Sequence, residues 1–261
     1  MEVLGSMPAK MEQLLELGLY SGTLLLGSGA EIYRVENTIY HLLTACGAEV
    51  VDCIATPTGI HLSAHAYGRI GTRVRRIDKR STNLGRVAAI NNLSRSLAGQ
   101  QNDPGEVLQA LCQIERDTEH SLVRWGPLGA AIGGTAFATL FGARGWELPT
   151  TAPVAFIVFH SAAFLRKAAI PGLLADFAGG FVAALLALSV TLVFPDMPSD
   201  RVILGAIMSL VPGVLLTAGA RDVLAGDLLS GIVRTIEALF TATAIAAGAG
   251  AILGWWIKWL G

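Results

Sequence analysis

The hydrophobic pattern of the chain changes near residue 125. Before that point apolar and polar positions alternate closely, whereas five long uncharged runs follow it, at 126–142, 148–165, 177–195, 202–220 and 238–257. A helix of roughly 17–25 residues crosses the hydrocarbon core of a bilayer, which is about 30 Å thick. Each run is long enough. We therefore predict a membrane protein, with a water-facing domain at 1–124 and an all-α bundle of five transmembrane helices at 125–261.

Within residues 1–124 the pattern predicts an α+β domain with the order α-α-β-β-β-α-α. A 3.6-residue period of apolar positions indicates helices, and short β-branched runs separated by turn residues indicate strands. In the third strand we expect Val74 to alternate with exposed Arg73 and Arg75. The predicted helices cover 11–28, 30–46, 84–98 and 104–119, and the predicted strands cover 50–55, 60–67 and 72–77.

Glycine is concentrated in the second half, which holds 18 of the 30 copies. Small residues spaced four apart let membrane helices pack closely. The pairs Gly129 and Gly133, and Gly250 and Gly254, have this spacing, so we expect them to lie at helix contacts.

Composition excludes several classes of protein. The chain is 52% hydrophobic and only 15% charged, with a net charge of -1, which argues against a nucleic-acid partner and favours contact with membrane lipid. Three cysteines do not suggest a disulfide framework. His61, Ser63 and His65 would share one side of a strand, but they lack further residues at ligand spacing, so we expect no metal or other cofactor. No phosphate-binding loop is present, which argues against ATP as the energy source.

The distribution of basic residues predicts the orientation in the membrane. Cytoplasmic connections of membrane proteins are enriched in Lys and Arg. With the N-terminus inside, the inner connections carry Arg166, Lys167 and Arg221, and the outer ones only Arg144 and Arg201. We expect a multi-pass protein of the cytoplasmic (inner) membrane with a cytoplasmic N-terminus, an external C-terminus and no cleaved signal peptide.

Three segments resemble the threonine/serine exporter (ThrE-type) family. They are Gly29-Ala-Glu-Ile-Tyr-Arg-Val-Glu36, Ala55-Thr-Pro-Thr-Gly-Ile60, and the stretch from Pro212-Gly213 through Arg221-Asp222-Val-Leu-Ala-Gly-Asp227 to Gly231-Ile-Val-Arg-Thr-Ile-Glu237. The resemblance implies a cytoplasmic domain joined to a membrane module that exports small amino acids. The chain resembles split members whose second module is a separate, smaller membrane protein. Some split members are associated with dicarboxylate export.

Charged residues and a proline inside the predicted spans are candidates for substrate and proton binding, since such residues are costly in lipid. Pro212-Gly213 should kink or break the fourth span, and broken helices often bind anionic groups. Arg234 could hold a substrate carboxylate and Glu237 a proton, or the two could form a structural ion pair on one helix face. Asp176 could carry protons, or could lie at the cytoplasmic interface near Arg166.

Two charged clusters are candidates for a gate. Arg221, Asp222 and Asp227 crowd the connection between the fourth and fifth spans, where a solvated turn is the simpler interpretation. Glu31, Arg34 and Glu36 follow a helix-starting glycine, and they could form either a local salt-bridge cap or an inner gate.

The leading interpretation is a subunit of a proton-driven secondary exporter of threonine or serine, without enzymatic activity and without catalytic residues. A dicarboxylate exporter of the succinate type is the nearest alternative. A regulatory subunit, or a membrane-anchored hydrolase-like enzyme with its chemistry around Glu31, Arg34, Glu36 and Thr58, are the others. A hetero- or homo-oligomer is expected. Sequence alone assigns neither the substrate nor the stoichiometry.

Overall fold

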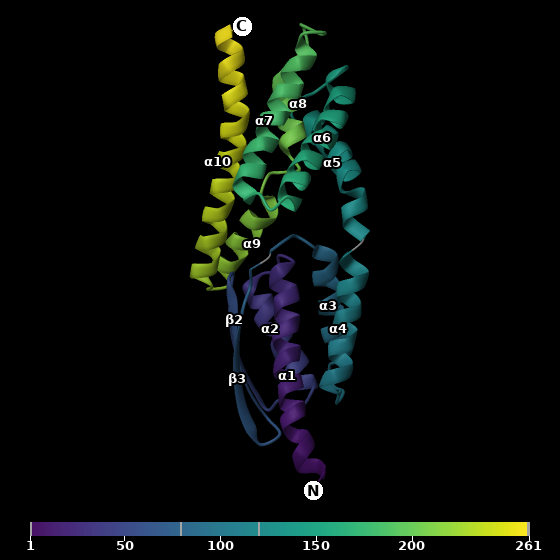
Figure 1. The fold of residues 1–261 in the computed structure, drawn as a ribbon, viewed down its shortest axis with the longest axis vertical. Coiled ribbons are helices and arrows are strands. Elements are labelled where there is room, and N and C mark those ends of the chain that lie inside the picture. The colour runs from purple at the N-terminus through teal and green to yellow at the C-terminus, as the bar shows by residue number, and fades with distance from the viewer. Residues whose placement is uncertain (1, 79, 120, 260–261) are drawn as a thin grey trace. The chain divides into compact units, whose positions relative to one another are not determined.

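The computed structural model describes residues 2–78, 80–119 and 121–259 and divides into two compact units (Figure 1). The first, here called the domain unit, comprises Met1–Ser121 and Val214–Thr235. The second, the membrane unit, comprises Leu122–Gly213 and Ile236–Gly261. Residues 214–235, which sequence reasoning placed with the membrane helices, thus cluster with the N-terminal residues.

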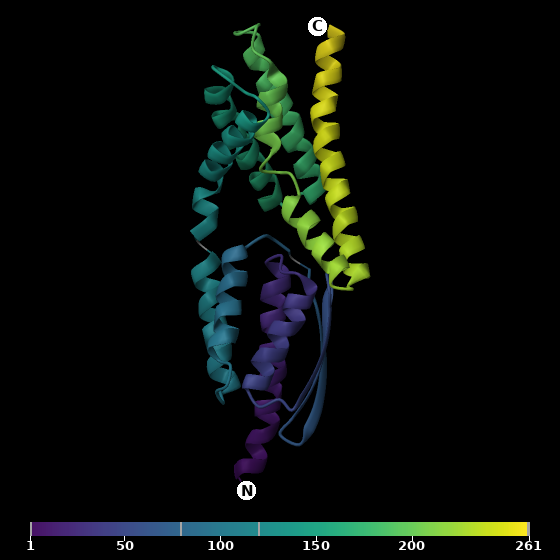
Figure 2. The ribbon, with the colours of Figure 1, turned by 180° about the vertical axis from the view of Figure 1, so that it is seen from behind.

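The domain unit has the predicted order of helices and strands. Figures 1 and 2 show α1 and α2 lying between the sheet on one side and α3 with α4 on the other. The unit also contains α9 and the first turns of α10. The elements are α1 (Glu2–Gly27), α2 (Ile32–Ala45), β1 (Val50–Thr56), β2 (Gly59–Ala66), β3 (Arg69–Arg76), α3 (Leu84–Ser96), α4 (Pro104–Glu119), α9 (Gly213–Leu224) and α10 (Leu228–Trp259).

Helix α1 forms the centre of the domain core because it is apolar on several faces and carries two glycines where it meets β2. Leucines along α1, such as Leu14 and Leu25, are fully buried. A Cβ atom added at Gly18 would lie 2.6 Å from the Leu62 side chain, and one at Gly22 would lie 2.5 Å from that of Ile60. The glycines thus let α1 lie close against the buried face of β2.

The sheet is an antiparallel β1-β2-β3 meander. Positive φ angles at Tyr67 (55°) and Gly68 (67°) fit the two-residue turn that joins β2 to β3. The expectation for β3 was wrong: Val74 is 62% exposed, whereas Arg75 faces α1 and binds Glu16 in a bidentate ion pair of 3.0 and 2.8 Å. The polar positions of β3 face inward because α1 presents acidic side chains there.

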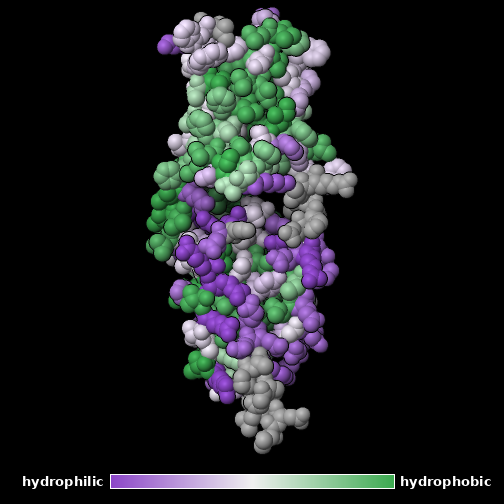
Figure 3. Space-filling view, viewed as in Figure 1, coloured by the Kyte–Doolittle hydropathy of each residue, from purple (hydrophilic) through white to green (hydrophobic). Residues whose placement is uncertain are grey.

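The membrane unit is a helical bundle with a core of small and branched apolar side chains. Figure 3 shows hydrophobic side chains gathered over these helices and hydrophilic ones over the domain unit. Within the described residues three helices are long and apolar enough to cross a membrane, namely α6, α7 and α10. The remaining elements are α5 (Ser121–Leu140), α6 (Glu147–Lys167), α7 (Gly172–Thr191) and α8 (Ser199–Ile207).

The fourth predicted span is broken at the proline, as expected. Helix α8 ends at Ile207, and α9 begins at Gly213, directly after Pro212. Proline lacks the backbone N–H that would continue the helix and clashes with the preceding turn. The 202–220 run therefore forms two short helices rather than one continuous span.

The glycine contacts differ from those expected. A Cβ atom added at Gly129, Gly133, Gly250 or Gly254 would meet no atom of another helix within 4 Å, so that prediction was wrong. The close approaches are at other glycines. At Gly248 of α10, for example, a Cβ atom would lie 2.0 Å from the carbonyl oxygen of Phe177 in α7. Spacing alone does not specify which helix face meets a neighbour.

Candidate functional site

The break between α1 and α2 creates the first half of the site. Gly29 has a φ of +88°, which reverses the chain after α1. Glu31 occupies the N-cap of α2, but its side chain makes no capping hydrogen bond. The first backbone amide of the helix, that of Ile32, instead donates to Oδ1 of Asp222 at 2.9 Å. A carboxylate from α9, 190 residues along the chain, therefore caps the positive end of the α2 dipole.

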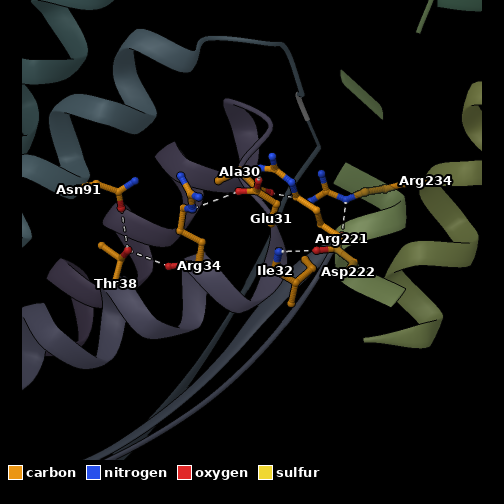
Figure 4. Close-up of polar contacts among 9 residues, drawn as sticks. All are labelled: Ala30, Glu31, Ile32, Arg34, Thr38, Asn91, Arg221, Asp222 and Arg234. Atoms are coloured by element: carbon orange, nitrogen blue, oxygen red, sulfur yellow. Dashed lines mark hydrogen bonds and ion pairs between the residues drawn. The ribbon is translucent and has the colours of Figure 1, made fainter. Parts of the chain in front are cut away.

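Asp222 also holds Arg234, on the neighbouring helix α10. Its Oδ2 lies 3.0 Å from Nε of Arg234, and the same guanidinium donates to the carbonyl oxygen of Ala30 at 2.7 Å (Figure 4). Asp222 is fully buried and Arg234 is 5% exposed. Two buried charges of opposite sign thus join α9, α10 and the start of α2.

A second, more exposed set of charges lies beside the first. Arg221 donates to Oε1 of Glu31 at 2.7 Å, and Nε of Arg34 lies 3.2 Å from Oε2 of the same carboxylate. Glu31 is 8% exposed, so both of its oxygens are paired in a largely buried position. We call Glu31, Arg34, Arg221, Asp222 and Arg234 the charge cluster.

The cationic neighbours decide the ionisation of Glu31. Burial alone would raise the pKa of its carboxyl, but a hydrogen bond from its own backbone and the positive charges of Arg221 and Arg34 lower the pKa below its ordinary value of 4.5. Glu31 is therefore ionised at neutral pH. Removing one partner from a buried pair costs about 3–5 kcal/mol, since the other charge is left uncompensated.

Two glycines let α9 and α10 approach closely enough for the buried pair to form. A Cβ atom at Gly231 would lie 2.3 Å from a side-chain carbon of Val223 and 2.7 Å from the carbonyl oxygen of Gly219. The turn between the helices uses Gly226 at a φ of +98°. Residues 213–235 therefore form a tight hairpin, the α9–α10 hairpin, with Asp222 and Arg234 on facing positions.

The remaining gate candidates, Glu36 and Asp227, lie close to each other. One oxygen of Glu36 accepts a hydrogen bond of 2.8 Å from the amide of Ala55 in β1. Burial raises the pKa of Glu36, and the negative charge of Asp227 adds to this, although the Ala55 amide acts in the opposite direction. All six predicted gate residues therefore gather in the domain unit at the hairpin and the start of α2.

The predicted substrate and proton residues are spread over both units. Pro212 and Gly213 belong to the membrane unit, whereas Arg234 belongs to the domain unit. Asp176 is 5% exposed and forms an ion pair with Arg166 of α6. Glu237 is half-buried on α10, one turn after Arg234.

Sequence reasoning missed a buried charge pair at the opposite end of the membrane unit. Glu147, at the start of α6, is 4% exposed and accepts a hydrogen bond of 2.5 Å from the amide of Arg144 and one of 3.3 Å from Arg201. These residues line a cavity of about 490 Å³ with Trp146 and Phe194. The only sequence signal was that Glu147 precedes a long apolar run.

The apolar helices and the charge cluster define a membrane protein with a polar domain. A family described as "Putative threonine/serine exporter" (ThrE) matches residues 16–256. The chain belongs to this family, whose members are transporters. No curated protein and no solved structure matches it.

Proposed function

We propose that this chain is one subunit of a secondary exporter that moves threonine, serine or similar small amino acids out of the cytosol. The domain unit's N-terminal residues would lie in the cytoplasm of a cell with an inner membrane, and a separate smaller membrane protein would supply a second module. Proton motive force would drive transport. Family membership and the apolar helices support the general class.

Five membrane crossings are part of this proposal. Helices α5, α6, α7 and α10 would each cross once, and α8 with α9 would together form the broken fourth crossing. Helix α10 has 32 residues, which gives a length of about 48 Å at 1.5 Å per residue. It is longer than the hydrocarbon core requires, which accommodates its first turns in the domain unit.

The charge cluster is the single observation that carries the functional proposal. Buried ion pairs contribute little net stability compared with apolar packing, so their presence favours a role in specifying or switching an arrangement. Here they tie the start of α2 to the α9–α10 hairpin through two buried charges and a backbone amide. We assign them to a cytoplasmic gate that is closed when these contacts are made.

Substrate would bind at the break before α9. The free amides at the start of a broken helix favour a carboxylate, such as that of an amino acid. Pro212 and Gly213 define this break. Arg234 could supply a guanidinium to substrate only after it leaves Asp222 and Ala30, so that substrate binding and gate opening would be linked.

Protons would move through Glu237 and Asp176. Each is a carboxylate on an otherwise apolar helix, and such residues mark ion pathways in membrane proteins. Asp176 is paired with Arg166, so its protonation would release that arginine.

Efflux from preloaded cells tests the proposal. Asp222→Asn, Arg234→Gln and Glu237→Gln should each lower threonine efflux at least about tenfold, since each removes a charge used in gating or coupling. Arg76→Gln, which removes an exposed charge on β3, is the matched control and should export normally. Succinate efflux is measured in parallel to distinguish the dicarboxylate alternative. Normal threonine and succinate efflux in all three variants, at normal membrane levels, contradicts the assigned roles.

A further inference from the structure

A polar cavity lies between α2 and α3, away from the residues assigned to transport. Its volume is about 430 Å³, within the range of small-molecule sites. The lining includes two arginines and a histidine, and none of the described residues that line it is acidic. Its principal polar residues are Arg34, Thr38, His41, Asn91, Ser94 and Arg95.

Several polar groups of this cavity lack protein partners. Ser94 is only 6% exposed, and its hydroxyl makes no hydrogen bond within the described residues. The Thr38 hydroxyl lies 3.0 Å from Oδ1 of Asn91, which links the two helices (Figure 4), but the Asn91 amide nitrogen has no partner in the described part of the chain. Buried polar groups are normally hydrogen-bonded, so these donors indicate a ligand or ordered solvent.

The two arginines set the charge that the cavity attracts. Arg95 is exposed and contacts only the neutral side chain of Asn92. Arg34 uses its Nε towards Glu31 and also contacts Tyr33, but a guanidinium has five N–H donors. Two guanidinium groups without a lining carboxylate produce a positive potential, which favours an anion with several oxygen atoms.

We propose that the cavity between α2 and α3 is a binding site for a small oxyanion, a carboxylate or a phosphate, held by Arg34 and Arg95 with Asn91 and Ser94 as neutral donors. The volume suits a ligand the size of a dicarboxylate or a small phosphate ester. This site is separate from the substrate site proposed at Pro212 and Gly213.

Arg34 connects the oxyanion site to the charge cluster. It pairs with Glu31, and Glu31 pairs in turn with Arg221 on α9. An oxyanion that binds Arg34 competes with Glu31 for the guanidinium and so weakens one contact of the closed gate. This link rests on the proposed gate, whereas the binding site does not.

Calorimetric titration of the full chain in detergent tests the binding site. Succinate and inorganic phosphate are the probes, and the uncharged succinamide is the ligand control. Arg95→Gln and Ser94→Ala should weaken binding, the first by at least about tenfold because a charge-assisted contact is lost. Arg76→Gln removes an equal charge from β3 and should leave the affinity unchanged. Thermal unfolding verifies that all variants are folded.

The outcomes separate the possible ligands. A preference for succinate assigns a carboxylate ligand, and a preference for phosphate assigns a phosphate ligand; either supports the site if Arg95→Gln weakens it selectively. Binding of neither probe, or equal weakening by Arg95→Gln and Arg76→Gln, overturns the proposal.

A second measurement tests the link to the gate. Glu31→Gln removes the carboxylate that competes for Arg34, so it should tighten binding of the same probe by roughly threefold or more, as reciprocal coupling requires. Unchanged affinity in a folded Glu31→Gln variant overturns the link through Arg34. Because this readout is binding and not efflux, its failure is distinguishable from failure of the transport proposal.

Discussion

At the level of single residues, Asp222 combines two tasks that are normally performed by different side chains. One oxygen caps the first amide of α2, and the other lies against the guanidinium of Arg234. Both contacts are removed from water, since Asp222 is fully buried. A change at this position therefore affects three helices.

Asp222→Asn should lower the free energy of unfolding by about 3 kcal/mol, because the Arg234 guanidinium would be left buried and uncompensated. Denaturant titration of the purified chain in detergent, followed by circular dichroism, measures this loss. The double variant with Arg234→Met should lose clearly less than the sum of the two single variants. Asp78→Asn, which breaks an exposed pair with Arg76, should change stability by less than about 1 kcal/mol. Strictly additive losses would show that Asp222 and Arg234 are not coupled.

Glu36 gives a prediction of pH dependence. Its pKa is raised from an ordinary value of 4.5, so the folded state holds this proton more tightly than the unfolded state does. Its contribution to stability is fully present below pH 4.5 and declines as the pH rises through the raised value. Glu36→Gln keeps an acceptor for the Ala55 amide but does not titrate.

The Glu36→Gln variant should match the wild type in acid, relative to a common offset, and become relatively more stable as the pH rises towards 8. Unfolding midpoints measured across this pH range check the sign. Asp227→Asn should reduce the pH dependence of the wild type, since the neighbouring negative charge contributes to the raised pKa. A relative loss of stability on raising the pH would contradict the assignment.

At the level of helices, packing at glycine positions determines whether the charge cluster can form. Gly231→Ala would place a methyl group 2.3 Å from Val223 and so force α9 and α10 apart. We expect threonine efflux to fall and the unfolding midpoint to drop, with an overpacking cost of about 1–3 kcal/mol. Gly250→Ala lies in the same helix, where an added methyl group meets open space. It should be neutral or slightly stabilising, and equal effects of the two changes would exclude a role for close packing.

The sequence predicted the elements of the domain unit better than their contacts. Apolar periodicity and turn residues were sufficient for the order of helices and strands, and Pro212 was sufficient for the break before α9. The inward-facing Arg75 could not be predicted, because its orientation depends on Glu16 of α1. Local patterns describe one element at a time, whereas side-chain orientation depends on its neighbour.

The same limit applies to the candidate site. Composition and resemblance identified Glu31, Arg221 and Asp222 as charged residues worth attention, but not the pairing of Asp222 with Arg234. The backbone amide of Ile32 and the carbonyl of Ala30 carry no sequence signal at all. The cavity beside Ser94 was also missed, since its residues come from two separate helices with ordinary polar composition.

At the level of the whole molecule, the proposal of five crossings predicts opposite sides for the two termini. Single cysteines introduced at Ala143 and Ala169, which follow α5 and α6 respectively, should react with a membrane-impermeant maleimide from opposite sides. Intact cells should label the first, and only lysed cells the second. The native Cys46, Cys53 and Cys112 are replaced by serine beforehand, and retained threonine efflux serves as the control. Labelling of both positions in intact cells would contradict the orientation.

Helix α10 contributes residues to both units without interruption between Leu228 and Trp259. Arg234 lies near its start, and the close contact of Gly248 with α7 lies four turns further along. A continuous helix behaves as a stiff rod, so a tilt or axial rotation imposed at one end reappears at the other. Mechanical work done at the cytoplasmic contacts is thus delivered directly to the bundle, and the chain needs no flexible joint to transmit it.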